Sequence, residues 1–189
     1  MINLLNHLAA ALTGAVQLAR FNASGMRYFD FSTIGFWRSF LAAGIVAPFF
    51  IALLVIRHSD NNAAIFIHHI CLESLTFLIA WLLFPLALFY VTIFIDRRNY
   101  YVPYIVAYNW SGAIQNGFSL PIAILSQLGV LSSSMANMLA LAAMFWVISF
   151  TFFVTRAALQ VKTATAVSIV LFDLTLGIFI ELVSNQFLW

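Results

Sequence analysis

Two carboxylates lie inside the last apolar stretch of the chain, residues 163–189, and they most need a chemical explanation. Asp173 and Glu181 interrupt a run that is long enough to span a bilayer. A spanning helix needs about 20 apolar residues, and a carboxylate within it is costly unless it has a partner or a path to water. At about 1.5 Å per residue, Asp173 falls near the midplane of a hydrocarbon core about 30 Å thick, and Glu181 falls near its outer boundary.

Further polar residues share helix faces in the other apolar stretches. A turn of about 100° per residue puts His69, Glu73 and Thr76 on one face, and Asn109, Asn116 and Gln127 on one face of a later segment. In the last segment the same spacing puts Asp173, Gly177, Glu181 and Ser184 on one face. Water cannot satisfy these groups within hydrocarbon, so we expect the faces to point into a helix bundle. The candidate intramembrane polar cluster consists of Asp173, Glu181, Asn109, Asn116, Glu73 and His69. Depth places His69, Glu73, Asn116 and Glu181 in the outer half, with Arg57 at the outer end of the first segment.

Two interpretations of these polar residues remain open. In the first, they connect helices, and Asp173 is protonated and hydrogen-bonds an Asn or Ser of a neighbouring helix. In the second, Asp173 and the face with Asn109 and Asn116 line a polar path through a small channel or transporter. The first is favoured because no basic residue lies deep in any apolar segment. The chain also lacks an internal repeat of the kind that transporters use.

The sequence predicts neither a metal site nor an enzyme. His69 and Glu73 lie one turn apart and are able to share a metal ion, whereas the adjacent His68 and His69 point about 100° apart. Two ligands are too few for a zinc site, so we expect no metal and no cofactor. The chain contains no His-Glu-x-x-His, Gly-x-Ser-x-Gly, glycine-rich phosphate loop or Cys-x-x-Cys motif.

Composition indicates a single membrane domain over residues 1–189. Hydrophobic residues make up 64% of the chain and charged residues 7%, whereas a soluble domain has about 25% charged residues. The net charge of +2 is too small to predict a nucleic-acid partner. Cys71 is the only cysteine, which excludes an internal disulfide.

Five apolar segments predict an all-α polytopic membrane protein with five transmembrane helices. They cover residues 36–56, 65–95, 101–128, 135–154 and 163–183, and each is long enough to span a bilayer. The second is too long for a perpendicular helix, so it tilts, kinks at Pro85 or begins outside the hydrocarbon. Pro121 either kinks the third segment or breaks it into two half-spans.

An amphipathic helix is predicted before these segments, over residues 1–20. Leu5, Leu8, Leu12 and Val16 follow helical spacing, and Asn6, Thr13 and Gln17 fill the opposite face. This pattern predicts a helix that lies in the membrane interface, and a helix packed against the spans is the alternative. No basic region precedes the apolar residues, so we expect no signal peptide.

Basic residues predict the orientation. In a five-span arrangement seven of the eight Lys and Arg residues fall on the N-terminal side, and Arg57 falls on the other. The positive-inside rule then gives a cytoplasmic N-terminus and an outer C-terminus, in what we expect to be a bacterial inner membrane.

This layout resembles the Yip family, and above all its bacterial Yip-like members. The resemblance covers most of the chain and rests on the five-span topology and on the segment GMRYFDFSTIGFWRSF at residues 25–40. The long hydrophilic N-terminal region and the Asp-Leu-Tyr-Gly-Pro motif of eukaryotic members are missing, so no functional residues are transferred. The resemblance implies a non-enzymatic protein that organises the membrane or binds partner proteins or lipids.

Three functions therefore remain in competition. The first is the Yip-like role, with the bilayer, other membrane proteins or further copies of the chain as partners. The second is a small channel or transporter. The third is an accessory subunit of a larger membrane complex, for which the twenty Phe residues would supply contacts with partners rather than with lipid.

Overall fold

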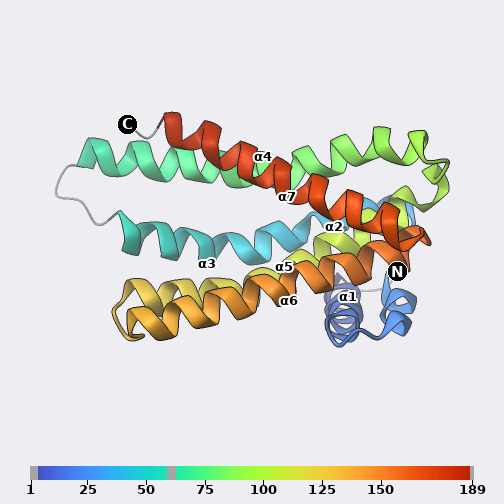
Figure 1. Cartoon of the computed structure of the whole chain (residues 1–189), viewed down its shortest axis with the longest axis horizontal. Coiled ribbons are helices and arrows are strands. Elements are labelled where there is room, and N and C mark those ends of the chain that lie inside the picture. Colours follow the sequence, from blue (N-terminus) through green and yellow to red (C-terminus); the bar gives the residue numbers. More distant parts are fainter. Residues whose placement is uncertain (1–3, 59–62, 188–189) are drawn as a thin grey trace.

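The computed structural model describes residues 4–58 and 63–187, which fold into helices with no strand among them. Five long helices run back and forth along one direction (Figure 1). They are α3 (Leu41–Arg57), α4 (Ala63–Phe94), α5 (Tyr101–Gln127), α6 (Ser133–Leu159) and α7 (Thr163–Gln186). Shorter elements are α1 (Leu4–Ala19), η1 (Ala23–Tyr28), α2 (Thr33–Ser39) and η2 (Arg98–Tyr100). The predicted all-α class is confirmed.

The long helices match the predicted apolar segments to within a few residues at most ends. The first segment, predicted at residues 36–56, is divided at Phe40 between α2 and α3. Pro85 and Pro121 both lie inside uninterrupted helices, so Pro121 does not break the third segment.

Within the described residues, four helical segments are long and apolar enough to cross a membrane. They are Thr33–Arg57, Ala63–Phe94, Ser133–Leu159 and Thr163–Gln186. The third predicted span, α5, is not among them. It has 27 residues, about 40 Å, but polar residues such as Asn109 and Gln115 lower its hydropathy. It lies at the centre of the bundle, in contact with α1, α2, α3, α4 and α6. A central helix faces protein on most sides, which explains its more polar sequence.

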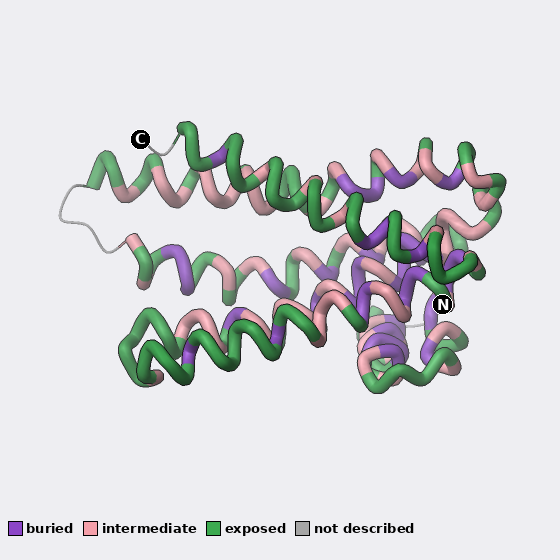
Figure 2. The backbone as a smooth tube through the Cα atoms, in the orientation of Figure 1, coloured by how far each residue is buried: buried purple, intermediate pink, exposed green. Residues whose placement is uncertain are grey.

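The core is concentrated at the end of the bundle that carries α1, which we call the α1 end; the opposite end is the distal end. Buried residues gather at the α1 end, and exposed residues predominate at the distal end (Figure 2). Most residues in the first half of α5 are buried, including Tyr104, Ile105 and Trp110, whereas residues 125–130 are exposed. Tight packing at one end therefore gives way to looser packing at the other.

The N-terminal helix α1 packs against η1, α5 and α6, and it crosses the direction of the long helices (Figure 1). Ala11, Ala15 and Leu18 are its buried contacts. The packing named above as an alternative is thus present. An apolar strip nevertheless stays accessible, with Leu5 68% exposed and Val16 37% exposed. Residues 1–3 of the predicted helix lie outside the described residues.

Two glycines allow the turn after α1 to fold back on it. A Cβ on Gly25 would lie 2.4 Å from the Gly14 carbonyl oxygen, and a Cβ on Gly14 would lie 2.8 Å from that of Gly25. Only glycine fits such a close approach of two backbones. Ser32 then caps α2, because its side chain accepts a hydrogen bond from the Gly35 amide at 3.1 Å.

Charge is divided unequally between the two ends. The α1 end, in its connections and the helix ends beside them, carries seven basic residues: Arg20, Arg27, Arg38, Arg97, Arg98, Arg156 and Lys162. Arg57 closes α3 at the distal end. The helix α1 and the C-terminal end of α7 lie at opposite ends of the bundle (Figure 1).

Candidate functional site

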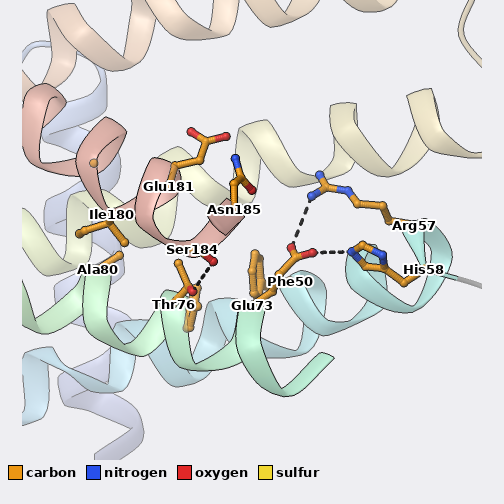
Figure 3. Close-up of a pocket in the computed structure, with 12 residues that line it drawn as sticks. Phe50, Arg57, His58, Glu73, Thr76, Ala80, Ile180, Glu181, Ser184 and Asn185 are labelled. Carbon is orange, nitrogen blue, oxygen red and sulfur yellow. Dashed lines mark hydrogen bonds and ion pairs between the residues drawn. The ribbon is translucent and has the colours of Figure 1, made fainter. Parts of the chain in front are cut away.

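A cavity of about 460 Å³ opens between α3, α4 and α7 in the distal half of the bundle (Figure 3). It is lined by Phe50, Arg57 and His58 from α3 and its C-cap, by Glu73, Thr76, Phe77 and Ala80 from α4, and by Gly177, Ile180, Glu181, Ser184 and Asn185 from α7. We call it the α3–α4–α7 cavity. Glu73 and Thr76 of α4 come from one of the polar faces that helical spacing predicts, and Gly177, Glu181 and Ser184 of α7 come from another. These two faces therefore point toward one another.

Glu73 is the electrostatic centre of the cavity wall. Arg57 Nη1 donates to Glu73 Oε2 at 3.4 Å, and the His58 imidazole Nε2 hydrogen-bonds the other carboxylate oxygen (Figure 3). The side chain of Glu73 is only 13% exposed, whereas that of Arg57 is 44% exposed. The carboxylate is therefore satisfied by two donors from the end of α3, and the guanidinium keeps further N–H groups directed to its surroundings.

Two hydrogen bonds join α4 to α7 along the same end. The Thr76 and Ser184 hydroxyls lie 2.8 Å apart (Figure 3). His68 Nε2 donates to the Phe187 carbonyl at 3.0 Å. Both contacts fix the rotation of α7 so that Glu181 and Asn185 face the cavity.

His69 and Glu181 are the less satisfied members of this region. The His69 ring packs against His58 with centroids 4.4 Å apart, and its Nδ1 is buried with no hydrogen-bond partner among the described residues. Glu181 lines the cavity without an ion pair or hydrogen bond to any described residue. Gly177 leaves room beside it, because a Cβ there would meet nothing within 4 Å.

Asp173 lies apart from this group and has its own partner. Tyr108 on α5 donates a hydrogen bond of 2.9 Å to Asp173 Oδ1. Aromatic rings pack around the pair. The ring centroid of Phe84 lies 4.6 Å from that of Tyr108 and 6.4 Å from that of Phe172. The partner is a phenol rather than the expected Asn or Ser.

The two asparagines of the candidate cluster are also separate from the cavity. Asn109 is fully buried at the α1 end, and its amide donates to the Ser39 hydroxyl at 2.9 Å. Asn116 donates to the Gly112 carbonyl of its own helix at 2.9 Å. The six candidates thus fall in several places: Glu73 and Glu181 line the cavity, His69 lies against His58, and Asp173, Asn109 and Asn116 each have different partners.

A smaller hollow of about 160 Å³ lies next to the cavity, between α4 and α5. It is lined by Ala80, Trp81, Tyr108, Gly112, Gln115 and Asn116. Ala80 borders both spaces, and Tyr108 connects the smaller one to Asp173. Polar side chains therefore line both spaces, and through Tyr108 they extend from the distal end of the bundle to Asp173 in the middle of α7.

Sequence reasoning did not identify His58 or Tyr108. His58 follows directly after Arg57, so its place at the end of an apolar segment was a usable signal. Tyr108 lies within the apolar segment predicted at residues 101–128, and a phenol within hydrocarbon also needs a hydrogen-bond partner.

No grouping of three or more His, Cys, Asp or Glu side chains suited to a metal ion occurs among residues 4–58 and 63–187. No family model, curated protein or solved structure matches the chain.

Proposed function

We propose that this chain is a non-enzymatic integral membrane protein that binds a lipid or another membrane protein through the α3–α4–α7 cavity. The observation that carries the proposal is a cavity with mixed charges set among helices whose other faces are apolar and exposed. Leu78 on α4, Ile178 on α7 and Val55 on α3 are 54%, 59% and 45% exposed. Such faces suit lipid, and a polar recess among them suits an amphipathic ligand or a polar partner helix.

The proposed topology has five spans, a cytoplasmic N-terminus and an outer C-terminus in a bacterial inner membrane. Two observations support it. The first is that α5 is long enough to span the bilayer. The second is that the α1 end carries seven basic residues, whereas the distal end carries only Arg57 among the described residues. The distal end is then the outer one.

Depth supports a binding site at the level of lipid headgroups. Starting from Thr163, a core about 30 Å thick corresponds to about 20 residues of α7, so Glu181 falls close to the outer boundary. Arg57 ends α3, so it also falls close to that boundary. The resemblance to Yip-like proteins adds an organising role in the membrane to this proposal.

Transport is the second candidate, because the hollow between α4 and α5 adjoins the cavity and reaches Tyr108. In that function the cavity is the outer entrance of a path that leads to Asp173. The aromatic packing of Phe84, Tyr108 and Phe172 narrows the space at this level. This packing favours the binding function over the transport function.

Photo-crosslinking tests the proposed function. Ile180 lines the cavity, whereas Ile178 on the same helix faces outward, so a diazirine amino acid at either position forms a matched pair. We expect a discrete lipid or protein adduct from position 180 that position 178 does not give. Filling the cavity by Gly177→Leu should reduce this adduct, and Gly44→Leu, which also meets open space, should not. Identical adducts from both positions would refute the binding function.

A further inference from the structure

We infer that the α3–α4–α7 cavity binds the headgroup of a phospholipid that carries both a phosphate and a primary ammonium group, as phosphatidylethanolamine does. The inference rests on the proposed function and specifies its ligand. It begins from the distribution of charge across the cavity. Arg57 projects from α3 on one side and Glu181 from α7 on the other (Figure 3).

The ammonium group is assigned to Glu181. Both oxygens of Glu73 already accept hydrogen bonds, one from Arg57 and one from His58, so Glu73 has little capacity left for a cation. Glu181 has no such partner among the described residues. Asn185, one turn further along α7, adds an amide oxygen at the same cavity wall. A carboxylate and an amide oxygen are acceptors for the three N–H donors of a primary ammonium.

The phosphate group is assigned to Arg57. A guanidinium has five N–H donors, and the contact of Arg57 with Glu73 uses one nitrogen at 3.4 Å. The remaining donors suit phosphate oxygens, which guanidinium binds through paired, charge-assisted hydrogen bonds. Glu73 and His58 fix the position of the arginine, so they act as positioning residues rather than as ligands.

The hydrocarbon part of the lipid is assigned to the apolar wall. Phe50 and Phe77 stack with ring centroids 4.7 Å apart, and together with Ile180 and Ala80 they line the same cavity. This wall lies on the membrane side of the charged residues, because Phe50 precedes Arg57 by seven positions, about 10 Å along α3. A lipid in the outer leaflet has the same arrangement, with its headgroup at the membrane surface and its acyl chains deeper in the membrane.

These contacts predict that the cavity prefers phosphatidylethanolamine to lipids with other headgroups and to soluble molecules with the same headgroup. A trimethylammonium headgroup has the same charge but no N–H donor, so it loses the hydrogen bonds to Glu181 and Asn185. A glycerol headgroup has no cation for Glu181, and its lipid carries a net negative charge. A soluble molecule with the same headgroup lacks the acyl chains for the apolar wall. We therefore expect the order ethanolamine over choline over glycerol.

Native mass spectrometry of the whole chain tests this order. The purified protein is released from nanodiscs that contain equal amounts of phosphatidylethanolamine, phosphatidylcholine and phosphatidylglycerol with identical acyl chains. We expect one phosphatidylethanolamine to remain bound preferentially. Glu181→Gln should reduce its retention roughly ten-fold, since a charge-assisted hydrogen bond is lost, and should abolish the preference over phosphatidylcholine. Asp96→Asn removes the same charge at the α1 end and should leave the retention unchanged.

Two further variants test the assignment of the phosphate to Arg57 and the need for open space in the α3–α4–α7 cavity. Arg57→Gln should reduce retention of phosphatidylethanolamine and phosphatidylcholine alike, because both carry the phosphate, whereas Arg20→Gln is the control at the α1 end. Gly177→Leu fills the cavity without changing charge, so it should reduce lipid retention while helix content stays that of the parent. It keeps the test informative if a charge variant fails to fold.

The outcomes distinguish this inference from the proposed function. Equal retention of the three lipids, or no effect of Glu181→Gln, overturns the ethanolamine assignment. Competition by soluble glycerophosphoethanolamine as strong as that by the lipid overturns the role of the acyl chains. A protein adduct alone from position 180 also overturns the lipid assignment but leaves the binding function intact. A lack of any specific adduct at position 180 refutes the binding function itself.

Discussion

The Tyr108 hydroxyl on α5 donates a hydrogen bond of 2.9 Å to the Asp173 carboxyl on α7. This contact links the central helix of the bundle to a helix whose other contacts are with α4 and α6. It also gives Asp173, which the sequence predicts to lie near the membrane midplane, a partner within the protein. A polar contact of this kind stabilises a helix pair without any requirement for flux.

Asp173→Asn should therefore leave stability almost unchanged, because the amide oxygen still accepts the hydrogen bond from Tyr108. Asp173→Leu should lower the free energy of unfolding by about 1 kcal/mol, through the lost bond and the unpaired phenol. Tyr108→Phe should have an effect of similar size. Unfolding in mixed micelles by titration with dodecyl sulfate measures all three changes.

Flux through liposomes separates the two candidate roles of Asp173. If the acid belongs to a path, Asp173→Asn removes the titratable group and should abolish cation or proton leak while the fold persists. If it joins helices, parent and variant should show the same leak. A leak in the parent that disappears in the Asn variant would replace the binding function by the transport function.

The helices and two of the polar faces were predictable from the sequence because both depend on local periodicity. Glu73 and Thr76 of α4, and Glu181 and Ser184 of α7, were placed on single faces by spacing alone, and the structure brings these two faces together at one cavity. Helical spacing fixes which residues share a face. It does not fix which two faces meet.

Contacts between helices were beyond the sequence for the same reason. Nothing in the local pattern pairs Tyr108 with Asp173 or His58 with Glu73, since the partners are far apart in the chain and on different helices. The central place of α5 had a visible sign, because a helix rich in Asn, Gln and Ser must face protein when it lies in a membrane. Its contacts with α1, α2, α3, α4, α6 and η2 depend on the packing of the whole bundle.

Gly25→Ala should loosen the attachment of α1. The added Cβ would lie 2.4 Å from the Gly14 carbonyl oxygen, a backbone atom with little freedom to move, so we expect a loss of about 1–3 kcal/mol. Gly44→Ala, in α3, is the matched control, because its Cβ meets nothing within 4 Å. A helix interior favours Ala over Gly by about 0.5–1 kcal/mol, so the control should be neutral or stabilising. Equal midpoints of thermal unfolding for the two variants would contradict the close packing.

Asp30 should make the α1 end sensitive to acid. The pKa of Asp30 is lowered, first by the hydrogen bond from the Ser32 amide at 2.9 Å, then by the Ser32 side chain and by the charges of His7 and Arg38. A lowered pKa in the folded state adds stability above the unfolded value of 3.8. That stability is lost as the pH falls through the folded pKa.

Thermal unfolding of the parent and of Asp30→Asn between pH 6 and strongly acidic solution measures this effect. The unfolding temperature of the parent should fall more steeply below about pH 4 than that of the variant, because only the parent loses a stabilising carboxylate. The Asp30 side chain is 41% exposed, so solvent screens these interactions and we expect a modest difference. Parallel curves for the two proteins would show that Asp30 does not contribute.

The accessible strip of α1 should lie in the apolar part of the membrane interface. Spin labels at Leu5 and Val16, which are exposed on the apolar face, should collide more with oxygen than with a water-soluble nickel complex. Labels at Asn6 and Thr13, on the polar face, should show the reverse. Equal accessibility at the four positions would favour a helix that is held by the bundle alone.

The last prediction concerns the orientation in the membrane and rests on the charge distribution between the two ends. Seven basic residues at the α1 end against Arg57 at the distal end predict that the α1 end is cytoplasmic.

In a Cys71→Ser background, which removes the single native thiol, Ser134→Cys at the start of α6 probes the distal end. Asn99→Cys between α4 and α5 probes the α1 end. Both positions are exposed. A membrane-impermeant maleimide should label Ser134→Cys in intact cells and Asn99→Cys only after permeabilisation. The opposite pattern would invert the topology, and it would place the α3–α4–α7 cavity at the cytoplasmic leaflet.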